Sequence, residues 1–207
     1  MSGSMTSPAS VDVYWLPLGA GGLPVVRWSG RLFEALAANR QHRARCDLYH
    51  SALEVRLGAD RFVIEMTPVW GNGYPDRGVV CEGSVGLPAL GRSRFFRYEV
   101  RCWRHGSIPD IAYAVASPQR VSADAQTARR VLDLVPAFPT ATWGRDEFGT
   151  GEMWNSNSLI AWLLARTGHD TGQITPPPRG RAPGWDAGLV VAARVSGGAT
   201  VAASPGA

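Results

Sequence analysis

The chain has 207 residues, 45% of them hydrophobic, and a formal net charge of +4. This length suits one well-buried domain and is short for two. All 21 basic residues are arginines. They form no dense basic block, so the small positive charge gives no reason to expect a nucleic-acid partner.

The three cysteines, Cys46, Cys81 and Cys102, are an odd number without CxxC spacing. They indicate neither a disulfide framework nor a zinc site, and we expect reduced thiols, a cytoplasmic protein, no metal and no cofactor. Residues 1–10 lack the basic and apolar regions of a signal peptide. Because no stretch approaches about twenty apolar residues, stable membrane insertion is not expected. The oligomeric state stays open.

The first half of the chain predicts a strand, a helix and a hairpin. Apolar residues alternate over 11–16, and Pro17 ends this strand. A helix is expected after the N-cap Ser29, because four apolar residues follow at helical spacing: Leu32, Phe33, Leu36 and Ala37. Alternation over 48–57 and a return over 61–66 predict a hairpin.

The second half predicts two strands, two helices and a last strand. The strands cover 78–85 and 95–103. One helix begins at Ser122 and ends before Pro136, and an apolar helix covers 155–167. The last strand is expected over 189–193.

These elements predict an α+β protein in which an antiparallel sheet packs against a few helices. We expect a single domain over 11–195, with a disordered N-terminus (1–10) and a disordered C-terminal tail (196–207).

Three polar residues form a candidate nucleophilic site if the chain brings them together. Ser156 lies at the start of the apolar helix, just after the expected cap Asn155, where unpaired backbone N–H groups suit a developing oxyanion. His50 opens a strand and can act as its base. Glu65, across the hairpin, can accept a hydrogen bond from the imidazole and hold one tautomer. Asn155 and Asn157 are the candidate cap and oxyanion residues.

Each of these residues also has a purely structural interpretation. Asn and Ser are favoured at helix N-termini because they cap the helix. A strand histidine is usually a partly buried, hydrogen-bonded residue. Glu65 could form a salt bridge with Arg61 or Arg56. Spacing along the chain leaves these alternatives open.

Aromatic residues near the candidate site predict a binding wall for an acyl or peptide chain. Trp70, Trp143 and Trp154 lie in turn-rich segments, and Tyr49 is next to His50. Packing in the core is the alternative for each tryptophan.

Two segments resemble the circularly permuted NlpC-type, papain-like superfamily, which includes the lecithin:retinol acyltransferase-like enzymes and the PPPDE isopeptidases. In 49–68, His50 opens a strand, and Met66-Thr67-Pro68 follows the Phe62-Val63-Ile64 run and Glu65. In the second segment, Asn155-Ser156-Asn157-Ser158-Leu159 is similar to the family's Asn-Cys-x-His-Phe helix start. The resemblance implies a permuted papain-like domain that acts on amides, esters or thioesters.

The chain departs from the family at two positions. Ser156 stands where the family has its nucleophilic cysteine, and Glu65 stands where the acyltransferase-like members have a second histidine. A carboxylate orients histidine well, so the second change is mild. The first is more serious, because a hydroxyl must lose its proton during attack whereas a thiol ionises readily.

Three functions from different classes follow. The first is a hydrolase or acyltransferase that uses Ser156, His50 and Glu65 on a small-molecule, lipid-acyl or peptide substrate. The second is an inactive papain-like relative that binds a peptide or acyl ligand in the same cleft. The third is an interaction domain whose eight tryptophans serve packing and partner contact.

Overall fold

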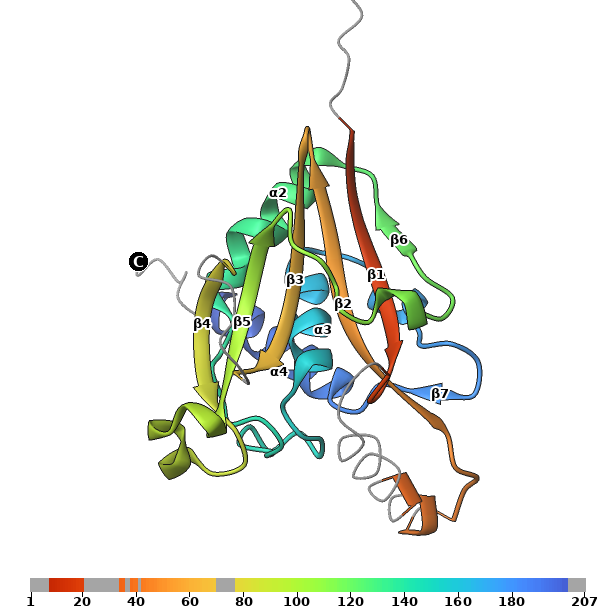
Figure 1. Cartoon of the computed structure of the whole chain (residues 1–207), viewed down its shortest axis with the longest axis vertical. Helices are drawn as coiled ribbons and strands as arrows, with labels where there is room; N and C mark the ends of the chain where they lie inside the picture. The colour runs from red at the N-terminus through yellow and green to blue at the C-terminus, as the bar shows by residue number, and fades with distance from the viewer. Residues whose placement is uncertain (1–7, 21–33, 36–37, 41, 70–76, 201–207) are drawn as a thin grey trace, which may run out of the picture.

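The computed structural model describes residues 8–20, 34–35, 38–40, 42–69 and 77–200 (Figure 1). Most of the helix expected after Ser29, the aromatic candidate Trp70, and most of both predicted tails lie outside these residues.

The fold is α+β, built on a seven-stranded sheet (Figure 1). Six strands follow the spatial order β4-β5-β3-β2-β1-β6, and every neighbouring pair is antiparallel. The short β7 pairs in parallel with the beginning of β2. The strands are β1 (Ala9–Pro17), β2 (Asp47–Leu57), β3 (Asp60–Pro68), β4 (Val79–Ser84), β5 (Arg97–Arg104), β6 (Gln119–Ser122) and β7 (Gly180–Arg181). This confirms the predicted antiparallel sheet and the predicted hairpin.

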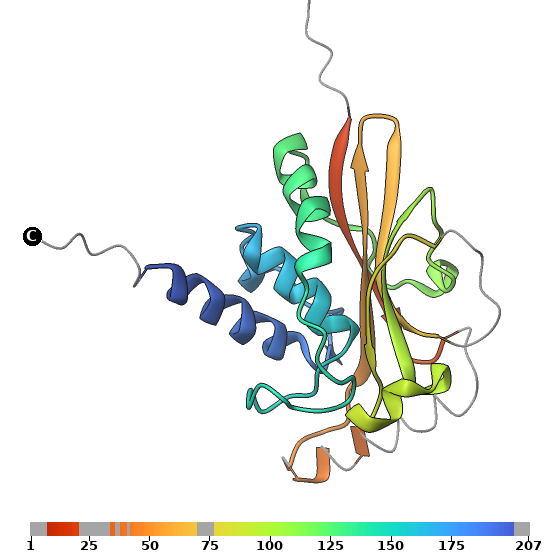
Figure 2. The same ribbon diagram turned by 90° about the vertical axis from the view of Figure 1, so that its left-hand side faces the viewer.

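Three helices cover one face of the sheet (Figure 2). They are α2 (Ala125–Leu134), α3 (Ser156–Arg166) and α4 (Trp185–Thr200). The prediction of α3 is confirmed. The predicted helix at Ser122 begins at Ala125, because residues 119–122 pair with β1 and Asp124 caps the helix by accepting from the Thr127 N–H.

The strand predicted over 189–193 was wrong, because these residues belong to α4. Their run of apolar side chains suits a buried strand or a buried helix equally well. Tertiary packing decides between them, and Gly188 permits that packing, since a Cβ there would lie 2.4 Å from the Ser158 carbonyl oxygen. The glycine therefore lets α4 pack closely against α3, and the helix extends into the tail that was predicted to be disordered.

The hairpin strands β2 and β3 separate towards the end of the sheet that carries His50. Their pairing runs from Leu57–Asp60 to Leu53–Ile64 and stops there. Strand β2 continues along β1 as far as the Tyr49–Pro17 pair. Figure 1 shows the two strands diverging, with α3 behind the opening.

The two faces of β2 contact different clusters of buried residues. Tyr49, Leu53 and Val55 pack in the main core together with the helices. Ala52 points the other way, into a small cluster with Tyr14 and Leu16. Because side chains alternate along a strand, His50 lies on the same face as Ala52, opposite the helices.

Across the described ranges, none of the helices combines the length and apolar character that crossing a membrane requires.

Candidate functional site

The first turn of α3 is held by a capping box. Asn155 is the N-cap, as predicted, and its side-chain oxygen accepts from the Asn157 N–H at 2.9 Å and from the Ser158 N–H. In return, the Ser158 hydroxyl accepts from the Asn155 N–H at 3.1 Å. The Ser156 N–H has no partner within the described part of the chain. It is therefore a free donor at the positive end of the helix dipole.

Asn157 ties this helix turn to β2 on both sides of His50. Its side-chain oxygen accepts from the Ser51 hydroxyl at 2.9 Å, and its Nδ2 donates to the Tyr49 carbonyl oxygen at 3.0 Å. These partners are the two chain neighbours of His50. The bridge fixes Ser156, which precedes Asn157, beside the segment of β2 that carries the imidazole.

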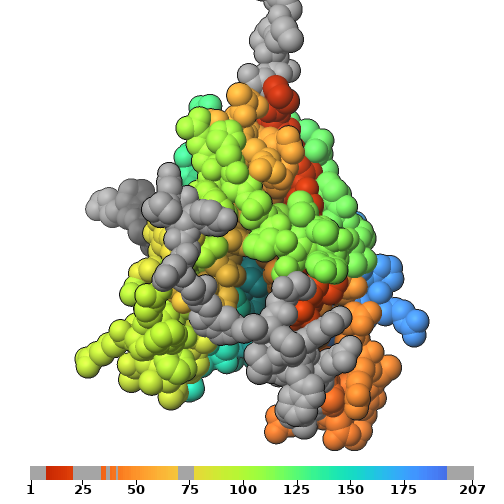
Figure 3. All heavy atoms as spheres, in the orientation of Figure 1, coloured from red at the N-terminus to blue at the C-terminus, as the bar shows by residue number. Residues whose placement is uncertain are grey.

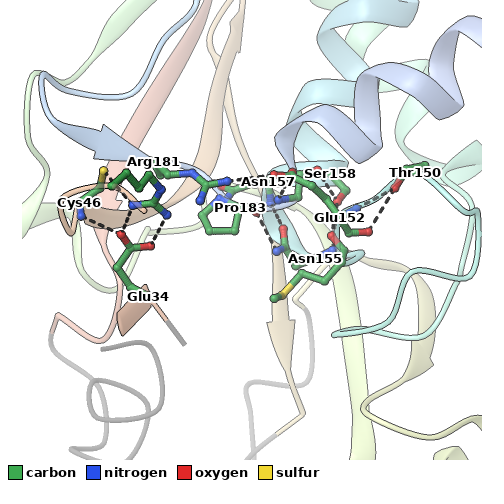
Figure 4. A network of polar contacts seen from close by, with 12 residues as sticks. Glu34, Cys46, Thr150, Glu152, Asn155, Asn157, Ser158, Arg181 and Pro183 are labelled. Carbon is green, nitrogen blue, oxygen red and sulfur yellow. Dashed lines mark hydrogen bonds and ion pairs between the residues drawn. The ribbon is translucent and has the colours of Figure 1, made fainter. Parts of the chain in front are cut away.

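A second set of contacts joins the helix start to the loop before α4 (Figure 4). Asn155 and Asn157 both donate their Nδ2 groups to the Pro183 carbonyl oxygen, at 2.8 and 2.9 Å. The Ser158 hydroxyl donates to the Gly184 carbonyl oxygen at 2.7 Å, and the Gly184 N–H donates to Glu152 at 2.7 Å.

Glycine is required at position 184. Its φ is +87°, and a Cβ there would lie 2.5 Å from Oδ1 of the Asn155 side chain. A side chain would therefore displace the cap residue that begins α3. Figure 4 shows how closely the loop approaches Asn155 and Ser158.

The side chains of Asn155 and Asn157 are thus occupied by structural hydrogen bonds. Both amides donate to main-chain carbonyls, and both amide oxygens accept from the protein. As oxyanion donors they would first have to give up these partners. The Ser156 N–H is the donor that remains.

His50 is a half-buried residue that pairs with Leu16 of β1. Burial lowers the pKa of its imidazole to about 4, because the charged form is less well solvated there. The ring is therefore neutral at physiological pH and has one nitrogen that can accept a proton.

Ser156 is only 5% exposed, and no hydrogen bond joins its hydroxyl to His50 among the residues the structure describes. Figure 3 shows a hollow on the sheet face opposite the helices, with atoms in the teal of the α3 segment deep beside the orange hairpin. The hollow coincides with the region where β2 and β3 separate. Catalytic hydrogen bonds are often long in proteins without substrate and shorten when substrate binds.

Glu65 lies on the same sheet face as His50, but it pairs with Arg101. The Arg101 guanidinium donates to Glu65 at 3.0 Å and to Glu99, also at 3.0 Å. Burial raises the pKa of the Glu65 carboxyl, and the nearby Arg101 opposes this shift. The structure contains no Glu65–His50 hydrogen bond between these two described residues.

The alternative salt bridges considered for Glu65 do not form either. Arg56 and Arg61 both contact Glu54, at 2.7 and 3.4 Å. Arg101 was not predicted as the partner, because its position opposite Glu65 depends on the β3–β5 register.

Two of the predicted substrate-binding aromatics belong to the core, which corrects the sequence interpretation. Trp154 is 1% exposed, stacks on Phe138 with ring centroids 5.0 Å apart, and donates its indole N–H to Pro139. Tyr49 is also buried in the main core.

Among the described candidate aromatics, Trp143 is the one that remains half-exposed. Its ring packs edge-on against Tyr98, with the ring centroids 5.9 Å apart. Its backbone forms an isolated β-bridge with Val85, just after β4. It can still contribute part of a binding wall.

Cys81 and Cys102 do not provide a second nucleophile. Burial raises the pKa of Cys81 and of Cys102 to about 11, so both are thiols at neutral pH. All three cysteines are unpaired. Within the described ranges, no group of histidine, cysteine and carboxylate side chains has the arrangement of a metal site.

Sequence reasoning missed the residues that hold the site together. Ser51, Pro183 and Gly184 each contact the first turn of α3. The Pro-Gly dipeptide does signal a turn, but nothing in its spacing connects that turn to Asn155.

No protein-family model, curated protein or solved structure matches this chain.

Proposed function

We propose that the protein is a serine-dependent hydrolase or acyltransferase in which Ser156 is the nucleophile and His50 is the base. The observation that carries this proposal is the Asn157 bridge. Hydrogen bonds to Tyr49 and Ser51, the two neighbours of His50, hold the start of α3 against β2. The resemblance to the permuted papain-like enzymes requires the segments of His50 and Ser156 to be neighbours, and this contact supports it.

The reaction assigned to this site is acyl transfer. The Ser156 oxygen attacks the carbonyl carbon of an amide, ester or thioester, and its proton passes to the neutral ring of His50. The Ser156 N–H and the helix dipole stabilise the oxyanion. The leaving group departs with the proton from His50, and water or another acyl acceptor then releases the acyl group from Ser156.

In this proposal Glu65 is the group that orients the imidazole of His50. Its contact with Arg101 keeps a paired carboxylate on the His50 side of the sheet. To accept a hydrogen bond from the imidazole, Glu65 has to exchange Arg101, which still has Glu99 as a partner, for His50.

A binding protein without catalysis is the second candidate. Two observations favour it: the Ser156–His50 hydrogen bond is absent between these described residues, and the low pKa of His50 makes the imidazole a weak base. In this candidate the same cleft holds a peptide or acyl ligand but does not cleave it.

A fluorophosphonate probe separates the two candidates. We expect the probe to label the wild-type chain covalently and to leave the Ser156→Ala variant unlabelled. Ser93→Ala, which changes a serine outside α3, is the matched control and should label as the wild type does. Equal labelling of the wild type and Ser156→Ala, or none of either, would support the binding protein.

The pKa of a thiol at position 156 measures the electrostatic environment of the site and does not require catalytic turnover. In a Cys46→Ser background, burial keeps Cys81 and Cys102 unreactive at neutral pH. The thiol introduced by Ser156→Cys should then react with iodoacetamide with an apparent pKa below the ordinary value of about 8.5, because the helix N-terminus favours the thiolate. The same thiol in a His50→Gln variant should titrate at higher pH. Identical titrations would remove His50 from the site.

A further inference from the structure

The connection between β4 and β5 exposes large apolar side chains. It consists of two short 3-10 turns, η1 (Pro88–Arg92) and η2 (Arg94–Phe96), which lie at the lower left of the molecule in Figures 1 and 3. Phe95 is 70% exposed, and Leu87, Leu90 and Phe96 are also exposed. Several large apolar groups in one short segment are unusual unless they contact a partner.

Backbone hydrogen bonds hold this segment in place while its large apolar side chains stay exposed. The Leu90 N–H donates to Leu87 at 3.0 Å, and the Phe96 N–H donates to Ser93 at 3.0 Å. The Val85 N–H closes the base of the connection by donating to Phe96 at 2.8 Å. The exposed apolar groups are therefore presented on a fixed support.

The charge of the segment is positive. Residues 87–97 contain three arginines, Arg92, Arg94 and Arg97, and no acidic residue. Arg97 pairs with Glu82 of β4, while Arg92 is exposed at the end of η1. Arginines next to exposed phenylalanines match the surface of an anionic bilayer, where phosphate groups lie beside acyl chains.

A second exposed apolar group provides an internal comparison. Ile111, Tyr113 and Val115 surround the turn η3 (Ile111–Tyr113) and are exposed to a similar extent. This turn follows Asp110 and has no arginine within residues 106–115. The turn η3 therefore exposes apolar side chains but has no arginine within these residues to pair with a phosphate.

The basic segment lies at the end of the sheet that carries the candidate site. Strand β4 ends and β5 begins there. Strand β2 runs in the same direction as β5, because both are antiparallel to β3, so β2 also begins at this end, with His50 near its start. The Val69 N–H, just after β3, donates to the Arg97 carbonyl oxygen at 2.9 Å. A surface bound by this segment would thus meet the end of the sheet nearest His50.

We propose that residues 87–97 dock the protein on the surface of an anionic lipid bilayer. The side chains of Leu87, Leu90, Phe95 and Phe96 enter the headgroup region, and the positive charges of the exposed Arg92 and Arg94 attract the anionic lipids. This is peripheral binding, which needs no membrane-spanning helix. The proposal goes beyond the proposed catalytic function and does not depend on Ser156.

Vesicle co-sedimentation of the full chain tests the proposal. Binding should be stronger to phosphatidylcholine vesicles that contain phosphatidylserine than to pure phosphatidylcholine vesicles. Replacing both aromatics (Phe95→Ser with Phe96→Ser) should weaken binding by on the order of a hundredfold, because two buried phenylalanines are lost. Replacing two arginines (Arg92→Gln with Arg94→Gln) should weaken it by roughly tenfold, and this loss should shrink at high salt.

The matched control changes the other apolar group. Ile111→Ser with Tyr113→Ser should bind vesicles as the wild type does, and Ser156→Ala should as well, which separates this proposal from the catalytic one. Equal binding to both vesicle types, or equal losses in the two paired apolar variants, would overturn the proposal. So would a concentration-dependent dimer that disappears with Phe95→Ser and Phe96→Ser, because a second copy of the chain would then cover the segment.

Discussion

The two faces of the central sheet are both buried, but they are stabilised by different interactions. On the helix side, Val13, Leu53 and Tyr98 are fully buried among apolar neighbours. On the other side, Glu54 and Glu99 are also almost completely buried, and each is paired with arginines. The helix face gains stability from removing apolar area from water. On the opposite face, each buried carboxylate needs a positively charged side chain as its partner.

Neighbouring residues of β3 show this difference directly. Ile64 packs in the main core, whereas the next residue, Glu65, points to the opposite face and pairs with Arg101. The candidate site lies where the two environments meet. Ser156 comes from the helix side, and His50 lies on the side of the ion pairs.

The largest effect is expected from the apolar face. Ile64→Ala should lower the free energy of unfolding by about 3 kcal/mol, because it leaves a cavity in a fully buried core. Urea denaturation measures this loss, which should not depend on salt. Ile64→Val is the graded control, with a loss of about 1 kcal/mol.

The matched change on the opposite face is Glu65→Gln. Its cost should stay below about 1 kcal/mol at neutral pH, because burial already disfavours the charged carboxylate and Arg101 keeps Glu99 as a partner. If Glu65→Gln cost as much as Ile64→Ala, the two faces would not differ in the source of their stability.

An intermediate effect is expected where the faces join. Asn157→Ala removes the bridge to β2 and leaves the Ser51 hydroxyl and the Tyr49 carbonyl without this partner, while the Pro183 carbonyl keeps Asn155, so about 2 kcal/mol of stability should be lost. Fluorophosphonate labelling of Ser156 should fall as well. Ser51→Ala keeps the contacts of Nδ2 and should cost about 1 kcal/mol. Full labelling in Asn157→Ala would mean that the bridge does not position Ser156.

The smallest effect at neutral pH comes from His50, on the side of the ion pairs, because it appears only when the pH falls. The pKa of His50 is lowered to about 4 in the folded protein, against about 6.5 for an unfolded chain. Between these values the unfolded state binds more protons, so His50 should lower the stability as the pH falls from 6.5 to 4 and have no effect above 6.5. His50→Gln should remove this part of the pH dependence in urea titrations. An unchanged slope would show that the imidazole is not desolvated.

The β2–β3 hairpin and α3 were predictable because their signals are local. Alternation defines both hairpin strands, and Asn155 followed by an apolar run defines the beginning of α3. The strand predicted over 189–193 failed because an apolar run does not distinguish a buried strand from a buried helix. Trp154 lies in the core, the alternative considered for each tryptophan, because a turn-rich segment can still fold back against the helices.

The sequence by itself determined most of the elements and the chemical character of the candidate residues, since side-chain alternation, capping and turn residues act over a few positions along the chain. Only the tertiary structure decided which groups meet. Asn157 reaches β2 across more than one hundred residues, and Arg101 pairs with Glu65 through the β3–β5 register. Burial then sets the pKa of His50, and burial is a property of the whole packed molecule.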